Sequence, residues 1–187
     1  DANSVDYYKA LFAQCSKMML SLQKMPQPII AQVHGIATAA GCQLVAMADL
    51  AVASAETRFA VSGINYGLFC STPSVGLSRN MLRKQAMEML LTGDFIDAAQ
   101  AKEQGLINQV VQPEALPQAA IDLARKIMAK PEAAVRMGKQ LFYSQLEVGI
   151  EQAYQMAGQT MACNMMDADA LEGVAAFIEK RKPNYKL

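Results

Sequence analysis

The pattern of apolar and polar positions predicts helices mixed with strands in the first part of the chain. Apolar residues recur every three or four positions over Ser4–Met25, which predicts an amphipathic helix that ends before Pro26. The β-branched run Pro28–Val33 predicts a strand. Helical spacing returns over Ala40–Ala48, after a stretch of small residues at Ala37–Gly41. We therefore expect a strand, a tight turn and a helix in this order.

Two further runs, Leu50–Ser54 and Arg58–Val61, predict buried strands, and the Gly-, Ser-, Asn- and Pro-rich stretch Ser62–Ser74 predicts a loop. The remaining pattern predicts one strand at Leu106–Val111 and otherwise helices, at Met81–Leu91, Asp97–Gln104, Leu116–Lys130, Pro131–Gln145, Val148–Met166 and Asp167–Lys180. Strands joined through helices favour a parallel sheet covered by helices. Because these strands are few, we expect an unusual fold or further strands upstream of Asp1.

The composition narrows the class of protein. The chain has 187 residues, 52% of them hydrophobic, and 17 basic residues balance 17 acidic ones. This is enough apolar material for one folded domain with a buried core, which excludes a disordered protein. Without a basic run we expect no nucleic-acid partner. The apolar runs are also shorter than the roughly 20 residues of a membrane span, so we expect a soluble protein.

The cysteines and the single histidine give little indication of metal binding or redox chemistry. Cys15, Cys42, Cys70 and Cys163 lack CxxC spacing, and His34 is the single histidine. We therefore expect no metal site, and reduced, buried cysteines in an intracellular protein. His34 has a side chain suited to acid–base catalysis, but we interpret it as structural.

The segment Ile30–Leu50 is the most informative part of the chain. A strand that runs through small residues into a helix leaves backbone N–H groups without partners at the start of that helix. Such groups bind anions, or the oxyanion that develops on a thioester or ester carbonyl. Alternatively, the small side chains only allow the helix and the strand to pack closely. The pattern leaves both interpretations open.

Four segments resemble the crotonase superfamily, the enoyl-CoA hydratases and isomerases, in their order and spacing. They are HGxAxxxGCxL…DLxxAS at His34–Ser54, Phe59-Ala60, the block Met87–Val111 and the tail Ala176–Lys186. Together they cover the chain from about Pro26 to Lys186. Within the family, GCQL at Gly41–Leu44 and GLFCSTP at Gly67–Pro73 resemble most closely the subgroup of enoyl-CoA hydratase domain-containing protein three.

This resemblance implies an α/β fold of the ClpP/crotonase spiral type. Residues 1–115 would form the C-terminal part of the spiral core. Residues 116–187 would form a helical region for trimerisation and for contact with CoA. The family domain begins well before Asp1, so we expect its N-terminal part to be missing here, in agreement with the shortage of strands.

The resemblance also implies a thioester site. One of the two backbone N–H groups of the family's oxyanion hole falls on Ala40, and the other lies upstream of this chain. The two glutamates that hydratases of the family use fall on Gln43 and Gly63. A glutamine does not exchange protons near neutral pH and a glycine has no side chain, so hydration by the usual acid–base route loses both of its titrating groups.

Further roles follow from the resemblance alone. Asn65, Tyr66, Cys70 and Ser71 would lie near the acyl group, although Asn65 and Ser71 are also typical turn residues and the other two typical packing residues. In the tail, the resemblance places Phe177 on the adenine ring and Lys180 on the phosphates of CoA. The alternative is a solvated helix end whose cations favour the helix dipole.

Two classes of function remain. The first is an enoyl-CoA hydratase/isomerase-type lyase of fatty-acid and acyl-CoA metabolism, or an enzyme with a related reaction: isomerisation, decarboxylation or thioester hydrolysis. The second is an acyl-CoA binder without catalysis, and a shortened chain without activity is a third possibility. The resemblance implies a homotrimer or a dimer of trimers and no cofactor beyond the CoA of the substrate. The expected compartment is the cytoplasm of a bacterium or the mitochondrion of a eukaryote.

Overall fold

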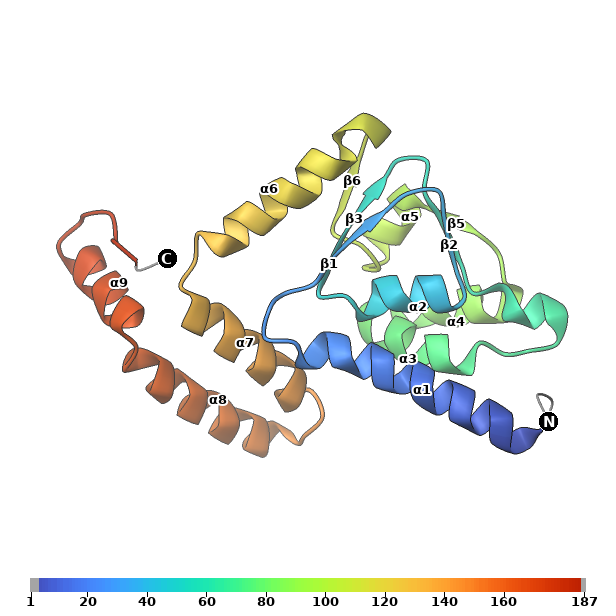
Figure 1. Cartoon of the computed structure of the whole chain (residues 1–187), viewed down its shortest axis with the longest axis horizontal. Helices are drawn as coiled ribbons and strands as arrows, with labels where there is room; N and C mark the ends of the chain where they lie inside the picture. The colour runs from blue at the N-terminus through green and yellow to red at the C-terminus, as the bar shows by residue number, and fades with distance from the viewer. Residues whose placement is uncertain (1–3, 186–187) are drawn as a thin grey trace. The chain divides into compact units, whose positions relative to one another are not determined.

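A computed structural model describes residues 4–185, and these fall into two compact units (Figure 1). The first unit contains the chain up to Leu22 and residues 29–121, and the second contains residues 23–28 and the chain from Asp122 onward. Lys186, the last residue of the tail that resembles the crotonases, lies outside the described residues, as do residues 1–3 of the expected core region.

The first unit contains two three-stranded sheets. One has the order β1 (Ile30–Val33), β3 (Leu50–Ser54), β6 (Gln109–Val111), and its strands are all parallel. The other has the order β2 (Ile36–Thr38), β4 (Arg58–Ala60), β5 (Ile96–Asp97). Here β2 and β4 are parallel, but β5 runs antiparallel to β4, so the prediction of a purely parallel sheet was wrong for this strand.

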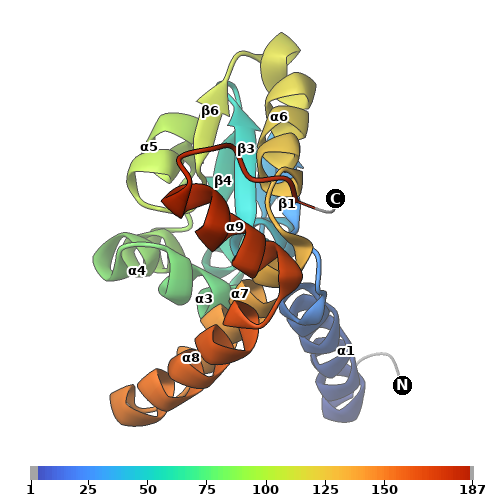
Figure 2. The same ribbon diagram turned by 90° about the vertical axis from the view of Figure 1, so that its left-hand side faces the viewer.

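The helices of the first unit gather beside these strands. They are α1 (Val5–Lys24), α2 (Ala40–Met47), α3 (Ser71–Asn80), α4 (Arg83–Thr92) and α5 (Ala98–Glu103). Figures 1 and 2 show α2, α3 and α4 grouped together and α5 beside β6. The expected loop Ser62–Ser74 is wrong in part, because it holds a short 3-10 helix, Ser62–Tyr66, and the start of α3. The last strand begins at Gln109, later than expected, because the N–H groups of Leu106 and Ile107 donate to the carbonyl of Ala101 in α5.

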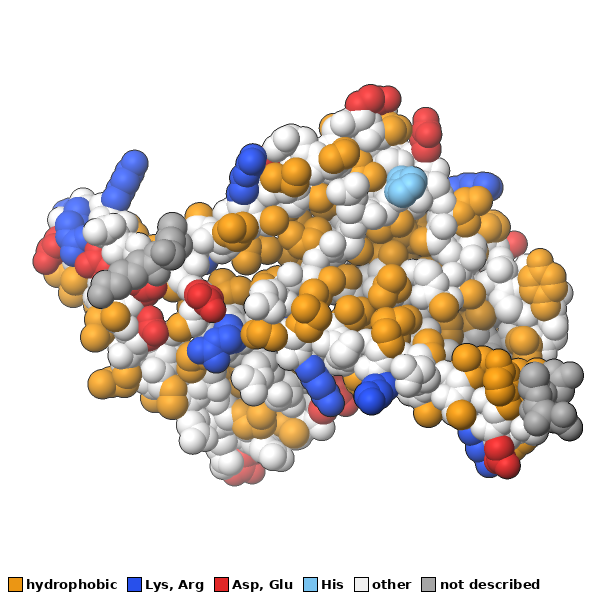
Figure 3. Space-filling view, viewed as in Figure 1, with side chains coloured by type: hydrophobic (Ala, Val, Ile, Leu, Met, Phe, Trp, Pro, Cys, Tyr) orange, Lys and Arg blue, Asp and Glu red, His pale blue; other side chains and the backbone are white. Residues whose placement is uncertain are grey.

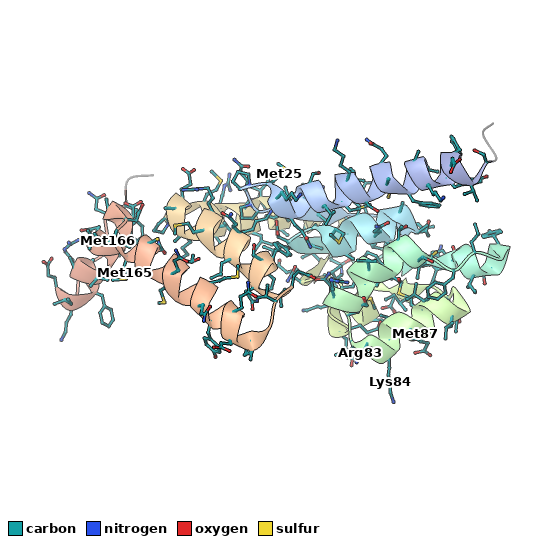
Figure 4. All side chains as sticks on the ribbon, turned by 90° about the horizontal axis from the view of Figure 1, so that it is seen from below. Met25, Arg83, Lys84, Met87, Met165 and Met166 are labelled. Carbon is teal, nitrogen blue, oxygen red and sulfur yellow. The ribbon has the colours of Figure 1, made fainter. Side chains whose placement is uncertain are left out.

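Local sequence explains some helix starts and packing explains others. α5 begins with a capping box, in which the Gln100 N–H donates to Asp97 Oδ1 at 2.8 Å and the Asp97 N–H donates to Gln100 Oε1 at 3.0 Å. α4 instead begins with two cations, Arg83 and Lys84, which the helix dipole disfavours there. Figure 4 shows these two side chains with Met87 on the outer side of the helix. Packing therefore holds α4, through its buried residues Ala86, Met89 and Leu90.

A buried hydroxyl network ties the strands of the first unit together. Thr57, between β3 and β4, donates its Oγ1–H to the carbonyl of Val33 at 3.1 Å and lies 3.2 Å from Ser54 Oγ. These hydroxyls are buried, so the hydrogen bonds replace the water that they lose on folding. The apolar core of this unit has Cys42, Phe59, Val61 and Leu77 among its fully buried members.

The second unit is helical. α6 (Leu116–Met128) passes into it from the first unit and is followed by α7 (Glu132–Gln145), α8 (Ile150–Met165) and α9 (Ala168–Ile178). α7 packs along α8, and the Lys139 ammonium donates to the carbonyl of Gln27 at 2.9 Å. Many apolar side chains of this unit are exposed (Figures 3 and 4), among them Phe142, Ile150, Tyr154, Met161, Met165 and Met166. None of the helices within residues 4–185 is both long and apolar enough to cross a membrane.

A candidate thioester site at the start of helix α2

The turn from β2 into α2 places a strained residue directly before the helix. Ala39 has φ 46° and ψ −115°, a backbone conformation that residues with a β-carbon rarely adopt. Backbone hydrogen bonds hold it on both sides. Its N–H donates to the carbonyl of Ala60 at the end of β4 at 3.0 Å, and its carbonyl accepts from the Gln43 N–H at 2.9 Å. The end of β4 therefore fixes the residue that leads into α2.

The amide of Ala40 is the open donor that this turn produces. Ala40 is the first residue of α2 and is exposed, and its N–H has no hydrogen-bond acceptor in the described part of the chain. The first N–H groups of a helix lie at the positive end of its dipole. This amide therefore has the chemistry needed to donate to a carbonyl oxygen that gains negative charge.

Gln43 lies one turn into the same helix and is only 4% exposed. Its Oε1 faces the Sγ atom of Cys15 on α1 at 3.9 Å. The neighbouring Cys42 is fully buried, and the pKa of its thiol is raised to about 12, chiefly by this burial and also by the nearby thiol of Cys70. The high pKa keeps the thiol of Cys42 protonated near neutral pH.

Gly63, the other position to which the resemblance assigns a family glutamate, has no room for a side chain. A β-carbon there would lie 2.7 Å from Cys70 Sγ and 2.7 Å from the carbonyl oxygen of Leu68. The second contact is the more restrictive, because the Leu68 N–H donates back to the carbonyl of Gly63 at 3.0 Å and closes the loop. A carboxylate at this position therefore requires a different course of the loop.

The four residues expected near an acyl group have different surroundings. Asn65 packs against Gly93 at the end of α4, where its Nδ2 would lie 2.8 Å from a β-carbon, whereas Tyr66 is 83% exposed. Cys70 packs against the core, and Ser71 begins α3 with its hydroxyl bonded to the carbonyl of Phe69 at 3.3 Å. The packing interpretation fits Cys70 but not Tyr66, which is exposed, and the roles of these four residues near an acyl group stay predictions.

The tail residues lie in the second unit, at the end of α9. Phe177 is 85% exposed, and Lys180 has the left-handed φ of 55°. The Lys180 N–H donates to the carbonyl of Phe177 at 3.3 Å and the Arg181 N–H to that of Ala176 at 3.0 Å. This pair of bonds is the Schellman motif, in which glycine usually occupies the position of Lys180.

An ion pair holds the chain after this turn. The Arg181 guanidinium donates to both carboxylate oxygens of Glu172, at 2.6 and 2.9 Å, and the Asn184 N–H also donates to this carboxylate at 2.7 Å. These donors lower the pKa of Glu172 to about 2, with the Arg181 hydrogen bonds as the largest cause. The segment behind Lys180 is thus folded back onto α9.

The remaining candidates stay outside these sites. His34 lies at the surface (Figure 3). All four cysteines are free, but the expectation that all are buried was wrong, because Cys163 is exposed and Cys15 and Cys70 are half-buried. Within residues 4–185, no three His, Cys, Asp or Glu side chains come together where they could hold a metal ion.

The sequence did not reveal the supporting residues Ala39, Ala60 and Cys15. The small-residue run marks the turn in which Ala39 lies, but the spacing carries no sign of its dihedral angles. The partners Ala60 and Cys15 come from distant segments, and only the folded structure brings them to α2.

Comparison with known proteins identifies the family. Residues 3–187 match the family model described as enoyl-CoA hydratase/isomerase. The mitochondrial enoyl-CoA hydratase domain-containing protein 3 of Mus musculus is 48% identical over 183 residues, which are 98% of this chain and 61% of the relative. The Homo sapiens protein of the same name is 46% identical over 178 residues, 95% of this chain and 59% of the relative. The chain therefore spans about three fifths of the length of these relatives.

Solved structures agree with this similarity. An enoyl-CoA hydratase from Mycobacterium smegmatis shows 62% identity and a TM-score of 0.96, over 98% of this chain and 72% of that one. Human enoyl coenzyme A hydratase domain-containing protein 3 shows 45% identity and a TM-score of 0.92, over 99% of this chain and 73% of the human one. The expected crotonase-type α/β fold is thus confirmed. The chain belongs to the enoyl-CoA hydratase/isomerase family of the crotonase superfamily, in the subgroup of enoyl-CoA hydratase domain-containing protein 3.

Proposed function

We propose that this chain binds acyl-CoA thioesters and that the N–H of Ala40 donates to the thioester carbonyl oxygen. The observation that carries the proposal is the amide of Ala40 at the start of α2, which follows the strained residue Ala39 and has no acceptor within the described residues. A main-chain donor at a helix start is already oriented before the ligand arrives. Its hydrogen bond strengthens as the carbonyl oxygen gains negative charge.

We further propose that the protein does not hydrate enoyl-CoA by the usual acid–base route. Gln43 is buried, and its amide can hold a water molecule or a substrate oxygen but cannot remove a proton from water. At Gly63 the structure leaves no space for a carboxylate. General acid–base help is typically worth about 10²- to 10⁴-fold in rate, so its loss leaves binding with little hydration.

Contact with the nucleotide end of CoA is assigned to the end of α9. Phe177 presents an exposed ring and Lys180 an exposed cation, and these suit a flat base and a phosphate. The exposed apolar helix faces of the second unit support a homotrimer or a dimer of trimers. The proposal requires no cofactor beyond CoA. By analogy with the relatives named as mitochondrial, the proposal places a eukaryotic form in mitochondria.

Hydration of enoyl-CoA is the second candidate function. The observation in its favour is the 62% identity with a solved structure that is named an enoyl-CoA hydratase. Such a reaction in this chain would need a proton-transfer group other than the side chains at positions 43 and 63.

Binding of two CoA compounds tests the first proposal. Crotonyl-CoA carries the thioester carbonyl, and the thioether S-butyl-CoA lacks it. We expect the intact protein to bind crotonyl-CoA at least about tenfold more tightly in calorimetry, as one charge-assisted hydrogen bond provides. Equal affinities for the two compounds would exclude the thioester site.

Hydration of crotonyl-CoA then separates the two candidate functions. We expect little turnover by the wild type and a gain in the Gln43→Glu variant. Gln152→Glu makes the same change on the exposed face of α8 and serves as a control that should show no gain. Turnover by the wild type equal to that of Gln43→Glu would favour the second candidate. Position 63 is left unchanged because a side chain there would collide with Leu68.

A further inference from the structure

The orientation of the thioester donor depends on the peptide plane between Ala39 and Ala40. We propose that the methyl group of Ala40 locks this plane, so that Ala40 acts through its side chain as well as its amide. The inference rests on the thioester-binding function proposed above. It assigns the methyl group a positioning role, since the group that touches the ligand is the N–H.

The strain at Ala39, taken by itself, would favour a half-turn of the peptide plane between Ala39 and Ala40. A half-turn of the plane changes ψ of Ala39 from −115° to about +65° while its φ stays at 46°. These angles lie close to the left-handed well, near φ about +57° and ψ about +47°, which residues with a β-carbon occupy more readily than the observed conformation. The strain at Ala39 therefore pushes the plane away from the orientation that the structure shows.

Ala40 opposes this rotation. The half-turn that relaxes Ala39 also changes φ of Ala40 from its helical value, near −63°, to about +117°. A residue with a β-carbon is sterically excluded there, whereas a glycine is not. The rotation would also break the hydrogen bond from the Gln43 N–H to the Ala39 carbonyl. The Ala40 methyl and this one bond thus hold the plane against the strain at Ala39.

The lock matters because the N–H and C=O groups point from opposite edges of a peptide plane, one as a donor and the other as an acceptor. In the observed orientation the N–H of Ala40 is open. After the half-turn the carbonyl oxygen of Ala39 would take its place and repel a thioester oxygen. A donor that cannot turn away needs no reorganisation when the ligand binds, which is the property that makes such sites effective.

The Ala40→Gly variant tests the lock, because it keeps the N–H and removes only the methyl group. The readout is the ratio of affinities for crotonyl-CoA and S-butyl-CoA, in which all contacts to the CoA moiety cancel. We expect this ratio to fall about threefold to tenfold in Ala40→Gly. Ala40→Ser restores a β-carbon, and its ratio should lie closer to that of the wild type. A second readout is the red shift of bound cinnamoyl-CoA, which reports polarisation of its carbonyl and should shrink in Ala40→Gly.

The control is Ala168→Gly. Ala168 is the first residue of α9, as Ala40 is of α2, so this substitution removes a similar helix preference and should leave the ratio unchanged. A wild-type ratio near one would overturn the proposed function itself. A high wild-type ratio that Ala40→Gly retains would overturn the lock alone. A fall in Ala168→Gly as large as in Ala40→Gly would also overturn it, since lost helix stability would then explain both.

Discussion

The Sγ atom of Cys70 lies 2.7 Å from the point where a β-carbon of Gly63 would stand. The thiol occupies the space that a side chain at position 63 would enter, and the carbonyl of Leu68 closes the same space from the backbone. The glycine and the cysteine are therefore a matched pair. The loop that carries them is packed against the core in a course that only glycine permits.

Gly63→Ala is expected to lower the free energy of unfolding by about 1 to 3 kcal/mol, because the added carbon overpacks a closed loop. Cys70→Ala combined with Gly63→Ala should recover only part of this loss, since the contact with the Leu68 carbonyl remains. Urea denaturation measures both. Gly158→Ala on α8 is the control, because its β-carbon would meet nothing within 4 Å. Wild-type stability of Gly63→Ala would contradict the packing described for this loop.

Ala39→Gly is expected to raise the free energy of unfolding by about 1 kcal/mol. Glycine accepts a φ of 46° and a ψ of −115° without the strain of about 1 to 3 kcal/mol that a β-carbon brings, although it also gains freedom in the unfolded chain. Thermal and urea unfolding give the value. A less stable Ala39→Gly variant would show that the strain at Ala39 is smaller than the entropy that glycine loses on folding.

Lys180→Gly is expected to stabilise α9 and to weaken binding of CoA. The left-handed φ of 55° favours glycine at this position, with a gain of a few tenths to about 1 kcal/mol. Loss of the cation should lower the affinity for CoA more at low than at high salt. Lys182→Ala removes a like charge two residues further on and should lower the affinity for CoA less. Wild-type affinity of Lys180→Gly at low salt would make this segment an ordinary solvated helix end.

The ion pair behind α9 is expected to lose its contribution to stability between pH 4.5 and about 2. The pKa of Glu172 is lowered from its ordinary value of 4.5 to about 2, so folding favours its ionised form. The contribution of ionised Glu172 to the free energy of unfolding is complete above pH 4.5 and is lost as the pH falls from there through 2. Unfolding of wild type and Glu172→Gln should differ at pH 5 and converge near pH 2. Glu56→Gln, at an exposed turn, is the control. A difference that persists at pH 2 would contradict this assignment.

Periodicity predicted the long elements well and the short ones poorly. α1 and the four helices after Leu116 carry apolar faces over ten residues or more, and their predicted bounds lie within a few residues of the observed ones. β2 was missed because Ala37 and Thr38 read as part of a small-residue turn, and its pairing with β4 comes from a distant segment. α3 was missed because Pro73 and Gly76 are typical of loops. In the structure both are buried, and Gly76 lies against Ala46 of α2.

The candidate site was predictable only as far as the chain order determines it. A strand, a run of small residues and a helix predict open amides near Ala40. The positive φ of Ala39 before this amide, and the hydrogen bond from the Ala39 N–H to the Ala60 carbonyl, are not encoded in the spacing. The resemblance supplied positions 43 and 63, but only the packing of Cys70 and Leu68 shows that Gly63 cannot simply be exchanged for a glutamate.

The donor at Ala40 belongs to the main chain, and this has an evolutionary consequence. Every residue type except proline supplies the same N–H, and every type except glycine keeps the β-carbon that we propose holds the plane, so mutation at most codons of this segment leaves the donor in place as long as the turn is kept. Side chains such as Gln43 are under no such protection. A lineage can therefore lose, exchange or regain its acid–base groups while it inherits the turn that we propose binds the carbonyl. The family's chemistry can diversify one side chain at a time on a backbone feature that drift alters least.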